Sequence, residues 1–104
     1  MADTHMEQCS KTGIRYEQRD EGELAISIKS LGLTRCSEAD QAVMKFAIRD
    51  EIRSLSYVKF EGNEIICKLP KAARVPKTLD AFRERILTRL NFESKITFAD
   101  RAAA

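Results

Sequence analysis

The residue types that most often carry enzyme chemistry are scarce in this chain. His5 is the only histidine, and the cysteines at 9, 36 and 67 are separated by 27 and 31 residues, with no C-x-x-C pair. A structural zinc site needs closely spaced ligands, and a disulfide framework needs paired cysteines. The sequence therefore predicts free thiols and no metal or cofactor. Because residues 1–12 lack the apolar segment of an export signal, we expect a cytoplasmic protein.

Cys36 is the one cysteine with a setting that could activate it. It precedes a predicted helix, and a helix N-terminus lowers the pKa of a thiol. A cysteine nucleophile also needs a base, yet the only histidine lies in the patternless N-terminal segment. The glycines at 13, 22, 32 and 62 are isolated, so no phosphate-binding loop is present. These observations predict a protein without catalytic activity.

A basic segment late in the chain is the most distinctive feature of the sequence. Residues 68–89 hold seven lysines and arginines against two acids, a local net charge of +5 in a chain whose total is +2. Arg85 and Arg89 share one ridge of a predicted helix, where like charges four residues apart repel each other. The predicted helix N-terminus favours anions. We predict that this segment binds an acidic partner or phosphate through Lys71, Arg74, Lys77, Arg85 and Arg89.

A second candidate patch lies on the preceding predicted helix. Phe46 projects away from the apolar stripe of this helix, near Arg49 and Arg53. An aromatic residue flanked by arginines is typical of a binding hot spot, provided that it is exposed. Glu51 falls in the middle of the apolar stripe itself. A carboxylate there must pair with an arginine, reach water, or handle a ligand or proton.

Length and composition limit the architecture to one small domain. The chain has 104 residues, of which 43% are hydrophobic and 33% charged, and no run of 18 apolar residues could cross a membrane. We expect a flexible tail over 1–12, a single domain over 13–99 and a short C-terminal tail over 100–104.

Hydrophobic periodicity predicts strands and helices in alternation. Residues 14–17 and 24–29 alternate with period two and predict a hairpin, and residues 58–60 and 65–69 predict a second hairpin around Gly62-Asn63. Ser37, with Asp40 three residues later, predicts the start of a helix that runs to about Leu55. Its predicted core face consists of Val43, Met44, Ala47, Ile48, Ile52 and Leu55.

A second predicted helix follows the prolines at 70 and 76. It is expected to begin at Thr78 as N-cap and to end near Leu90, with Asn91 at the C′ position. Ile96 and Phe98 then predict a last strand. The resulting order, βαββαβ, predicts an α+β fold: a ferredoxin-like antiparallel sheet with both helices on one face and an additional N-terminal edge strand.

The predicted sheet offers a further contact surface. Ile66 is expected on the solvent face of its strand, between Glu64 and Lys68. An apolar residue there, together with an open edge strand, favours a homodimer through the sheet face or edge. The two central predicted strands contain no aromatic residue, so the sheet lacks the stacking surface of an RNA-recognition motif.

The pattern as a whole predicts a small regulatory or binding protein. Its expected partner is an acidic protein or a nucleoprotein complex met through the basic surface. The first alternative is sequence-independent, salt-sensitive binding of nucleic acid by residues 68–89. A small enzyme or a ligand-binding domain is a further alternative. No membrane contact is expected.

Overall fold

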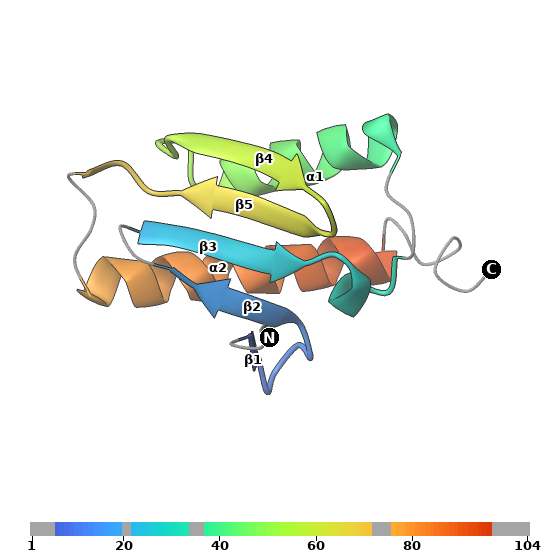
Figure 1. Cartoon of the computed structure of the whole chain (residues 1–104), viewed down its shortest axis with the longest axis horizontal. Helices are drawn as coiled ribbons and strands as arrows, with labels where there is room; N and C mark the ends of the chain where they lie inside the picture. Colours follow the sequence, from blue (N-terminus) through green and yellow to red (C-terminus); the bar gives the residue numbers. More distant parts are fainter. Residues whose placement is uncertain (1–5, 20–21, 34–36, 72–75, 97–104) are drawn as a thin grey trace.

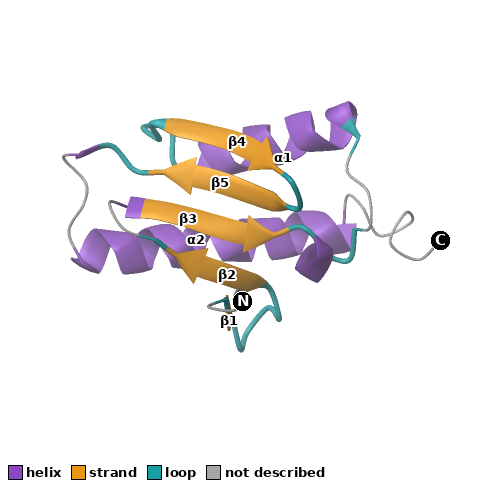
Figure 2. Ribbon diagram, viewed as in Figure 1, coloured by secondary structure: helices purple, strands orange, loops and turns teal. Residues whose placement is uncertain are grey.

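The computed structural model describes residues 6–19, 22–33, 37–71 and 76–96. It is an α+β fold in which two helices cover one face of a five-stranded antiparallel sheet (Figures 1 and 2). In chain order the elements are β1 (Glu7–Gln8), β2 (Arg15–Gln18), β3 (Glu23–Ser27), a 3-10 turn (Lys29–Leu31), α1 (Glu38–Glu51), β4 (Tyr57–Glu61), β5 (Glu64–Lys68) and α2 (Pro76–Ile96).

The strand order in the sheet is β1-β2-β3-β5-β4. Helix α1 joins β3 to β4, and β5 lies between these two strands. The ferredoxin-like order is not confirmed, because the described residues contain no strand after α2, and β2 pairs with the outer side of β3. Strand β1 was not predicted. It lies within the segment expected to be a tail and pairs Glu7 with Tyr16.

The β4–β5 hairpin follows its sequence prediction closely. Glu61 pairs with Glu64, which leaves Gly62 and Asn63 as a two-residue loop. Gly62 has a φ of +59°, a conformation that side-chain-bearing residues seldom adopt. Glycine at this position therefore permits the tight turn that brings the two strands together.

Helix α1 begins as predicted and ends earlier. Ser37 Oγ accepts a hydrogen bond from the Asp40 backbone N–H at 3.1 Å, and Asp40 Oδ2 accepts one from the Ser37 N–H at 3.3 Å. This capping box supplies partners for two backbone donors at the helix start. Ile52 is already extended, with φ −138°, so the helix stops at Glu51 rather than near Leu55.

Helix α2 is longer at both ends than the sequence predicts. It begins at Pro76, a residue well suited to the first helical turn, so the assignment of Thr78 as N-cap is wrong. Asn91 continues the helix instead of ending it, and Ile96 is helical instead of extended. Phe98 lies outside the described residues. The short alternation at Ile96 was too brief to distinguish a strand from one more helical turn.

The hydrophobic core lies between the helices and the sheet. Leu24 and Ile26 of β3 pack there with Ile65 and Cys67 of β5. The helices contribute Met44 and Ile48 from α1 and Phe82, Ile86, Leu87 and Leu90 from α2. Successive side chains of a strand point to opposite faces of the sheet, so Glu23 and Ser27 of β3 face away from the helices. We call the face without helices the open sheet face.

The open sheet face has a buried centre, contrary to the sequence prediction for Ile66. Ile66 is only 1% exposed, and Ala25, which pairs with it, is fully buried. Arg19 reaches across this face to carboxylates of Glu17 (2.9 Å), Glu23 (3.5 Å) and Glu64 (3.2 Å). The long side chains of the face thus cover its apolar centre with their stems. Ile66 is therefore not exposed, and the argument for a dimer through this face, which depended on its exposure, no longer holds.

Tyr57 and Lys59 complete the cover on the β4 side. The Tyr57 hydroxyl donates to Glu23 Oε2 at 2.6 Å, and the Lys59 ammonium lies 5.0 Å from the centre of the Tyr57 ring. The hydrogen bond to the Glu23 carboxylate raises the pKa of Tyr57 to about 12. The same bond lowers the pKa of Glu23. A polar network therefore closes the face that the helices leave uncovered.

Candidate functional site

The outer face of α1 and α2 carries a cluster of exposed apolar side chains. Phe46 is 69% exposed, Phe92 55%, Ile96 64% and Val43 38%. These four are the exposed large hydrophobic residues of the described part of the chain. We call them the helical-face patch. Val43 was predicted to face the core, and its exposure corrects that assignment.

Helical geometry places the four residues together. The helices run in opposite directions (Figure 1), and the Arg89 Nη1 atom of α2 contacts Asp50 Oδ2 of α1 at 2.9 Å. From Asp50, Phe46 and Val43 follow at four and seven residues toward the start of α1. From Arg89, Phe92 and Ile96 follow at three and seven residues toward the end of α2. Each helix therefore carries a row of two exposed apolar side chains. Both rows start next to the Arg89–Asp50 ion pair and extend in the same direction along the antiparallel helices.

Beside the patch lies an ion-pair cluster formed by Asp50, Glu51, Arg85, Arg89 and Glu93. Arg89 Nη1 also contacts Glu51 Oε2 at 2.9 Å, and Arg89 Nε contacts Glu93 Oε2 at 3.0 Å. Arg85 Nη2 lies 3.4 Å from Glu51 Oε1. The Asp50 carboxylate, followed by those of Glu93 and Glu51, raises the pKa of Arg89 above its ordinary value. Glu51 thus pairs with arginines, one of the alternatives that the sequence left open.

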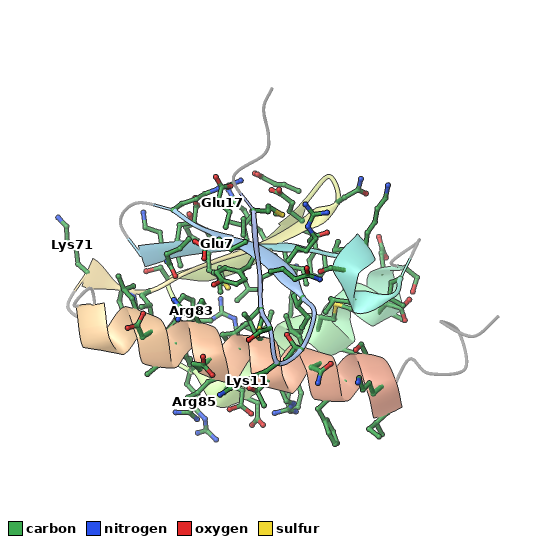
Figure 3. The ribbon with its side chains drawn as sticks, turned by 90° about the horizontal axis from the view of Figure 1, so that it is seen from below. Glu7, Lys11, Glu17, Lys71, Arg83 and Arg85 are labelled. Carbon is green, nitrogen blue, oxygen red and sulfur yellow. The ribbon has the colours of Figure 1, made fainter. Side chains whose placement is uncertain are left out.

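The structure places the predicted basic residues in different surroundings. Lys71 is exposed and points away from Arg85, toward the far end of the molecule (Figure 3). Arg74 lies outside the described residues, and Lys77 is in the first turn of α2, with no description of its side chain. Arg85 and Arg89 lie in the ion-pair cluster. Those described side chains therefore do not form one uncompensated basic patch.

The second predicted patch is better supported by its geometry. Phe46 is exposed, as the prediction required; Arg49, three residues on in α1, is exposed as well, and so is Arg53 beyond the end of the helix. The Arg49 Nη1 atom donates to the Leu55 carbonyl at 3.3 Å, which holds its stem against the end of α1. The sequence reasoning missed Phe92 and Ile96. Their spacing continues the helical period from Arg85 and Arg89, a signal that the expected strand at Ile96 obscured.

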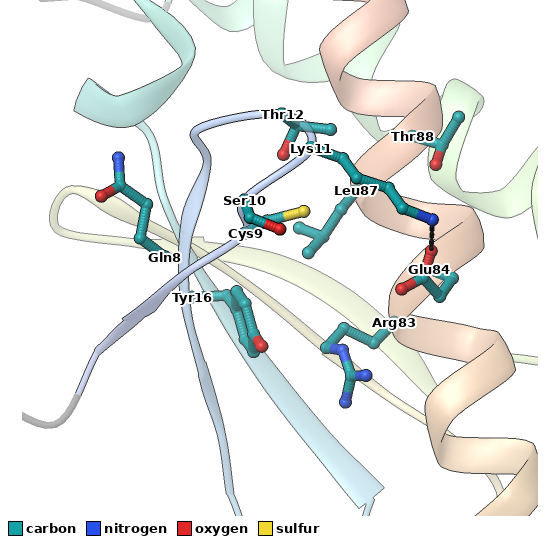
Figure 4. Close-up of a pocket in the computed structure, with 10 residues that line it drawn as sticks. All are labelled: Gln8, Cys9, Ser10, Lys11, Thr12, Tyr16, Arg83, Glu84, Leu87 and Thr88. Atoms are coloured by element: carbon teal, nitrogen blue, oxygen red, sulfur yellow. Dashed lines mark ion pairs between the residues drawn. The ribbon is translucent and has the colours of Figure 1, made fainter.

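A hollow lies between the N-terminal segment and α2, and it contains Cys9 (Figure 4). It has a volume of about 200 Å³. Tyr16 and Arg83 form one wall, with the Arg83 guanidinium 5.6 Å from the centre of the Tyr16 ring, and the Lys11 ammonium lies 3.9 Å from Glu84 Oε1. A hydrogen bond with the Thr12 hydroxyl is the main influence that lowers the pKa of Cys9.

The cations of this hollow lie next to carboxylates, and none of the described residues that line it is a histidine. Lys11 faces Glu84, and Arg83 Nη1 lies 3.2 Å from Asp80 Oδ1, so its cations already have carboxylate partners. Cys36, the thiol singled out by the sequence, lies outside the described residues. The described residues contain no group of three or more His, Cys, Asp or Glu side chains that could hold a metal. Within them, no helix has both the length and the apolar character needed to span a membrane.

The chain matches no protein-family model, and comparisons with curated proteins and with solved structures find no significant similarity.

Proposed function

We propose that this chain is a small non-catalytic binding domain that contacts an acidic protein through the outer face of α1 and α2. One observation carries the proposal: the exposed large hydrophobic side chains of the described residues all belong to α1 and α2, the two helices joined by the Arg89–Asp50 pair. Contiguous exposed apolar surface is typical of protein-interaction sites. Phenylalanines at its centre fit the role of anchors that fill a partner's pockets.

The charges around the patch favour an acidic partner. Arg49 and Arg53 line it on the α1 side, and the Arg85 side chain is 59% exposed on the α2 side. Cations at the rim of an interface mainly set partner choice and the rate of encounter. The expected binding surface therefore combines an apolar centre with a basic rim.

The proposed binding role of the 68–89 segment has less support than this surface. Arg89 is committed to three carboxylates, and Lys71 lies apart from Arg85. A nucleoprotein complex remains a candidate partner if its protein component supplies the acidic surface. Direct binding of nucleic acid through this segment is the second candidate, and the absence of any shift of DNA or RNA in a gel at low salt would remove it.

A reducing cytoplasm is the setting that we propose for this interaction. Cys9 and Cys67 are both free thiols, and Cys67 lies in the core. Secreted domains of this size more often use their cysteines in disulfides.

Site-specific photo-cross-linking tests the proposed function. A photoreactive amino acid at position 46 or 92 should give adducts of defined mass in extracts of the source cells. The same probe in place of the exposed Arg15, which lies on the open sheet face, is the matched control and should give none. Phe92→Asp should abolish the adduct formed from position 46. Adducts of equal yield from position 15, or none from positions 46 and 92, would rule out the helical-face patch as the contact surface.

A further inference from the structure

We infer that the partner segment bound by the helical-face patch is an acidic amphipathic α-helix of another protein. The inference rests on the proposed function and adds the secondary structure and charge of the ligand. Three observations support it: the shape of the surface, the composition of its rim, and the poor fit of other occupants.

The surface has the form that accepts a helix. Its two apolar stripes run side by side along antiparallel helices, and each extends seven residues from the Arg89–Asp50 pair, about 10 Å of helix. Next to Phe92, on the side of the ion-pair cluster, lies an open hollow of about 420 Å³, which is lined also by Glu51, Glu84, Arg85, Thr88 and Arg89. A third helix laid along two packed helices fills such a hollow with its own side chains. It would present apolar anchors at i, i+3 or i+4, and i+7.

The rim of the surface indicates the charge of that helix. On α1, the exposed residues Lys45 and Arg49 lie four residues apart on the flank of the patch, preceded by Glu38, and the exposed Arg53 follows beyond the end of the helix. On α2, Lys95 is exposed, whereas the exposed Arg85 pairs with Glu51 and the exposed Glu84 pairs with Lys11. The ion-pair cluster holds three carboxylates and two guanidiniums, so it adds no net positive charge, and the basic part of the rim is mainly that of the α1 side. Carboxylates on the flank of a docked helix would face the Arg49 and Arg53 side of the patch.

Two other occupants fit the surface less well. In a second copy of the chain, docking face to face would bring two basic rims around one apolar contact, and like charges across an interface oppose binding. A nucleic acid would offer phosphates to the arginines, but its backbone has no apolar counterpart for Phe46 and Phe92.

A pair of designed peptides tests the inference. Both are helical, about 18 residues long, and carry the same leucine stripe, while one has glutamates and the other lysines on its flanks. Fluorescence anisotropy with the full chain should show binding of the glutamate peptide and at least tenfold weaker binding of the lysine peptide. Added salt should reduce the difference in affinity between the two peptides. Arg49→Glu/Arg53→Glu should reverse the preference between the two peptides.

Matched controls separate charge from apolar contact. Arg15→Glu/Lys71→Glu changes the same number of charges away from the helical face and should leave both affinities unchanged. Phe46→Asp should remove binding of both peptides, and circular dichroism should show that each variant remains folded. Failure of the glutamate peptide to bind, or equal binding of both peptides, would overturn the inference.

Two further outcomes distinguish the inference from the proposed function. If the glutamate peptide does not bind but positions 46 and 92 still cross-link to another protein, the binding face stands and the acidic helix is wrong. A mass by light scattering of twice 11.8 kDa that Phe46→Asp returns to the monomer value would identify a second copy as the occupant and overturn the inference.

Discussion

The Arg89 guanidinium and the Asp50 carboxylate, 2.9 Å apart, join the two helices at the boundary between the ion-pair cluster and the helical-face patch. Arg89 is the more enclosed partner, because its side chain is 21% exposed against 43% for Asp50. Its second contact, Glu93, lies in the part of α2 that faces the core. The residue that was predicted to bind a partner therefore contributes first to the packing of α1 on α2.

Arg89→Met should lower the free energy of unfolding by about 2 kcal/mol, because it removes the partner of the Glu93 and Glu51 carboxylates, which are only 10% and 25% exposed. Arg85→Met is the matched control. Its single ion pair with Glu51 is more exposed, so we expect a loss of less than about 0.5 kcal/mol. Urea unfolding of both variants measures the difference. Equal small losses would show that the cluster does not hold the helices together.

Ile66→Ala should destabilise the protein by about 2–4 kcal/mol, as strongly as Ile65→Ala on the helix-covered face, because both side chains are buried. An isoleucine on a solvated sheet face would contribute far less. Denaturant unfolding of the two variants compares the faces directly. A loss below about 1 kcal/mol for Ile66→Ala alone would mean that the cover over the open sheet face is not closed.

Tyr57 should titrate with a midpoint of about 12, because its hydroxyl donates to the Glu23 carboxylate. The protonated phenol is favoured in the folded state. This contribution to stability is therefore present below pH 10 and is lost as the pH rises from about 10 to 12. The ultraviolet absorbance of phenolate in a Tyr16→Phe background measures the midpoint. Glu23→Gln should return it toward 10, and an unchanged midpoint would contradict the assigned cause.

Acid should affect the same pair in the opposite direction. The pKa of Glu23 is lowered by the Tyr57 hydroxyl and by Arg19, so its contribution is present above the ordinary value of 4.5 and is lost as the pH falls through the lowered pKa. Urea unfolding across this acidic range should show a smaller loss of stability in Glu23→Gln than in the unaltered protein. An identical loss would mean that Glu23 is not linked to folding in acid.

Cys9 should be alkylated by iodoacetamide at neutral pH faster than Cys67. The Thr12 hydroxyl lowers the pKa of Cys9, whereas burial raises the pKa of Cys67 to about 12. Thr12→Val should slow the reaction of Cys9, and Ser10→Ala, in the same hollow, should not. Peptide mass mapping in a Cys36→Ser background measures each thiol separately. Faster labelling of Cys67 would mean that the core opens more readily than its burial indicates.

Local signals in the sequence were sufficient for elements whose determinants lie within a few residues. Ser37 and Asp40 predicted the start of α1 because a capping box is formed by neighbours in the chain, and Gly62 predicted the β4–β5 turn for the same reason. The ends of α2 were missed. Asn91 can end a helix or continue it, and the outcome depends on packing against α1, which is remote in sequence.

The site was harder to predict than the fold, because exposure is a tertiary property. Phe46 was recognised from its angle on the helix, while Val43, only 60° away, was assigned to the core. Ile66 was expected in solvent because its strand has polar neighbours. No local pattern shows that Arg19, just after β2, and Tyr57 of β4 bind carboxylates on the same face of the sheet.

The two sides of the sheet are protected by different forces. Under the helices, β3 and β5 are shielded by hydrocarbon, which responds little to ionic strength, whereas over Ala25 and Ile66 the shield is Arg19 with its three glutamates. Concentrated salt, or protonation of these glutamates, should therefore let water reach the sheet from the open sheet face and not from the side of the helices. Amide hydrogen exchange would then become faster in the middle of β3 and β5, while the amides of the helices keep their protection. The access of water to one side of this sheet therefore depends on salt concentration and pH.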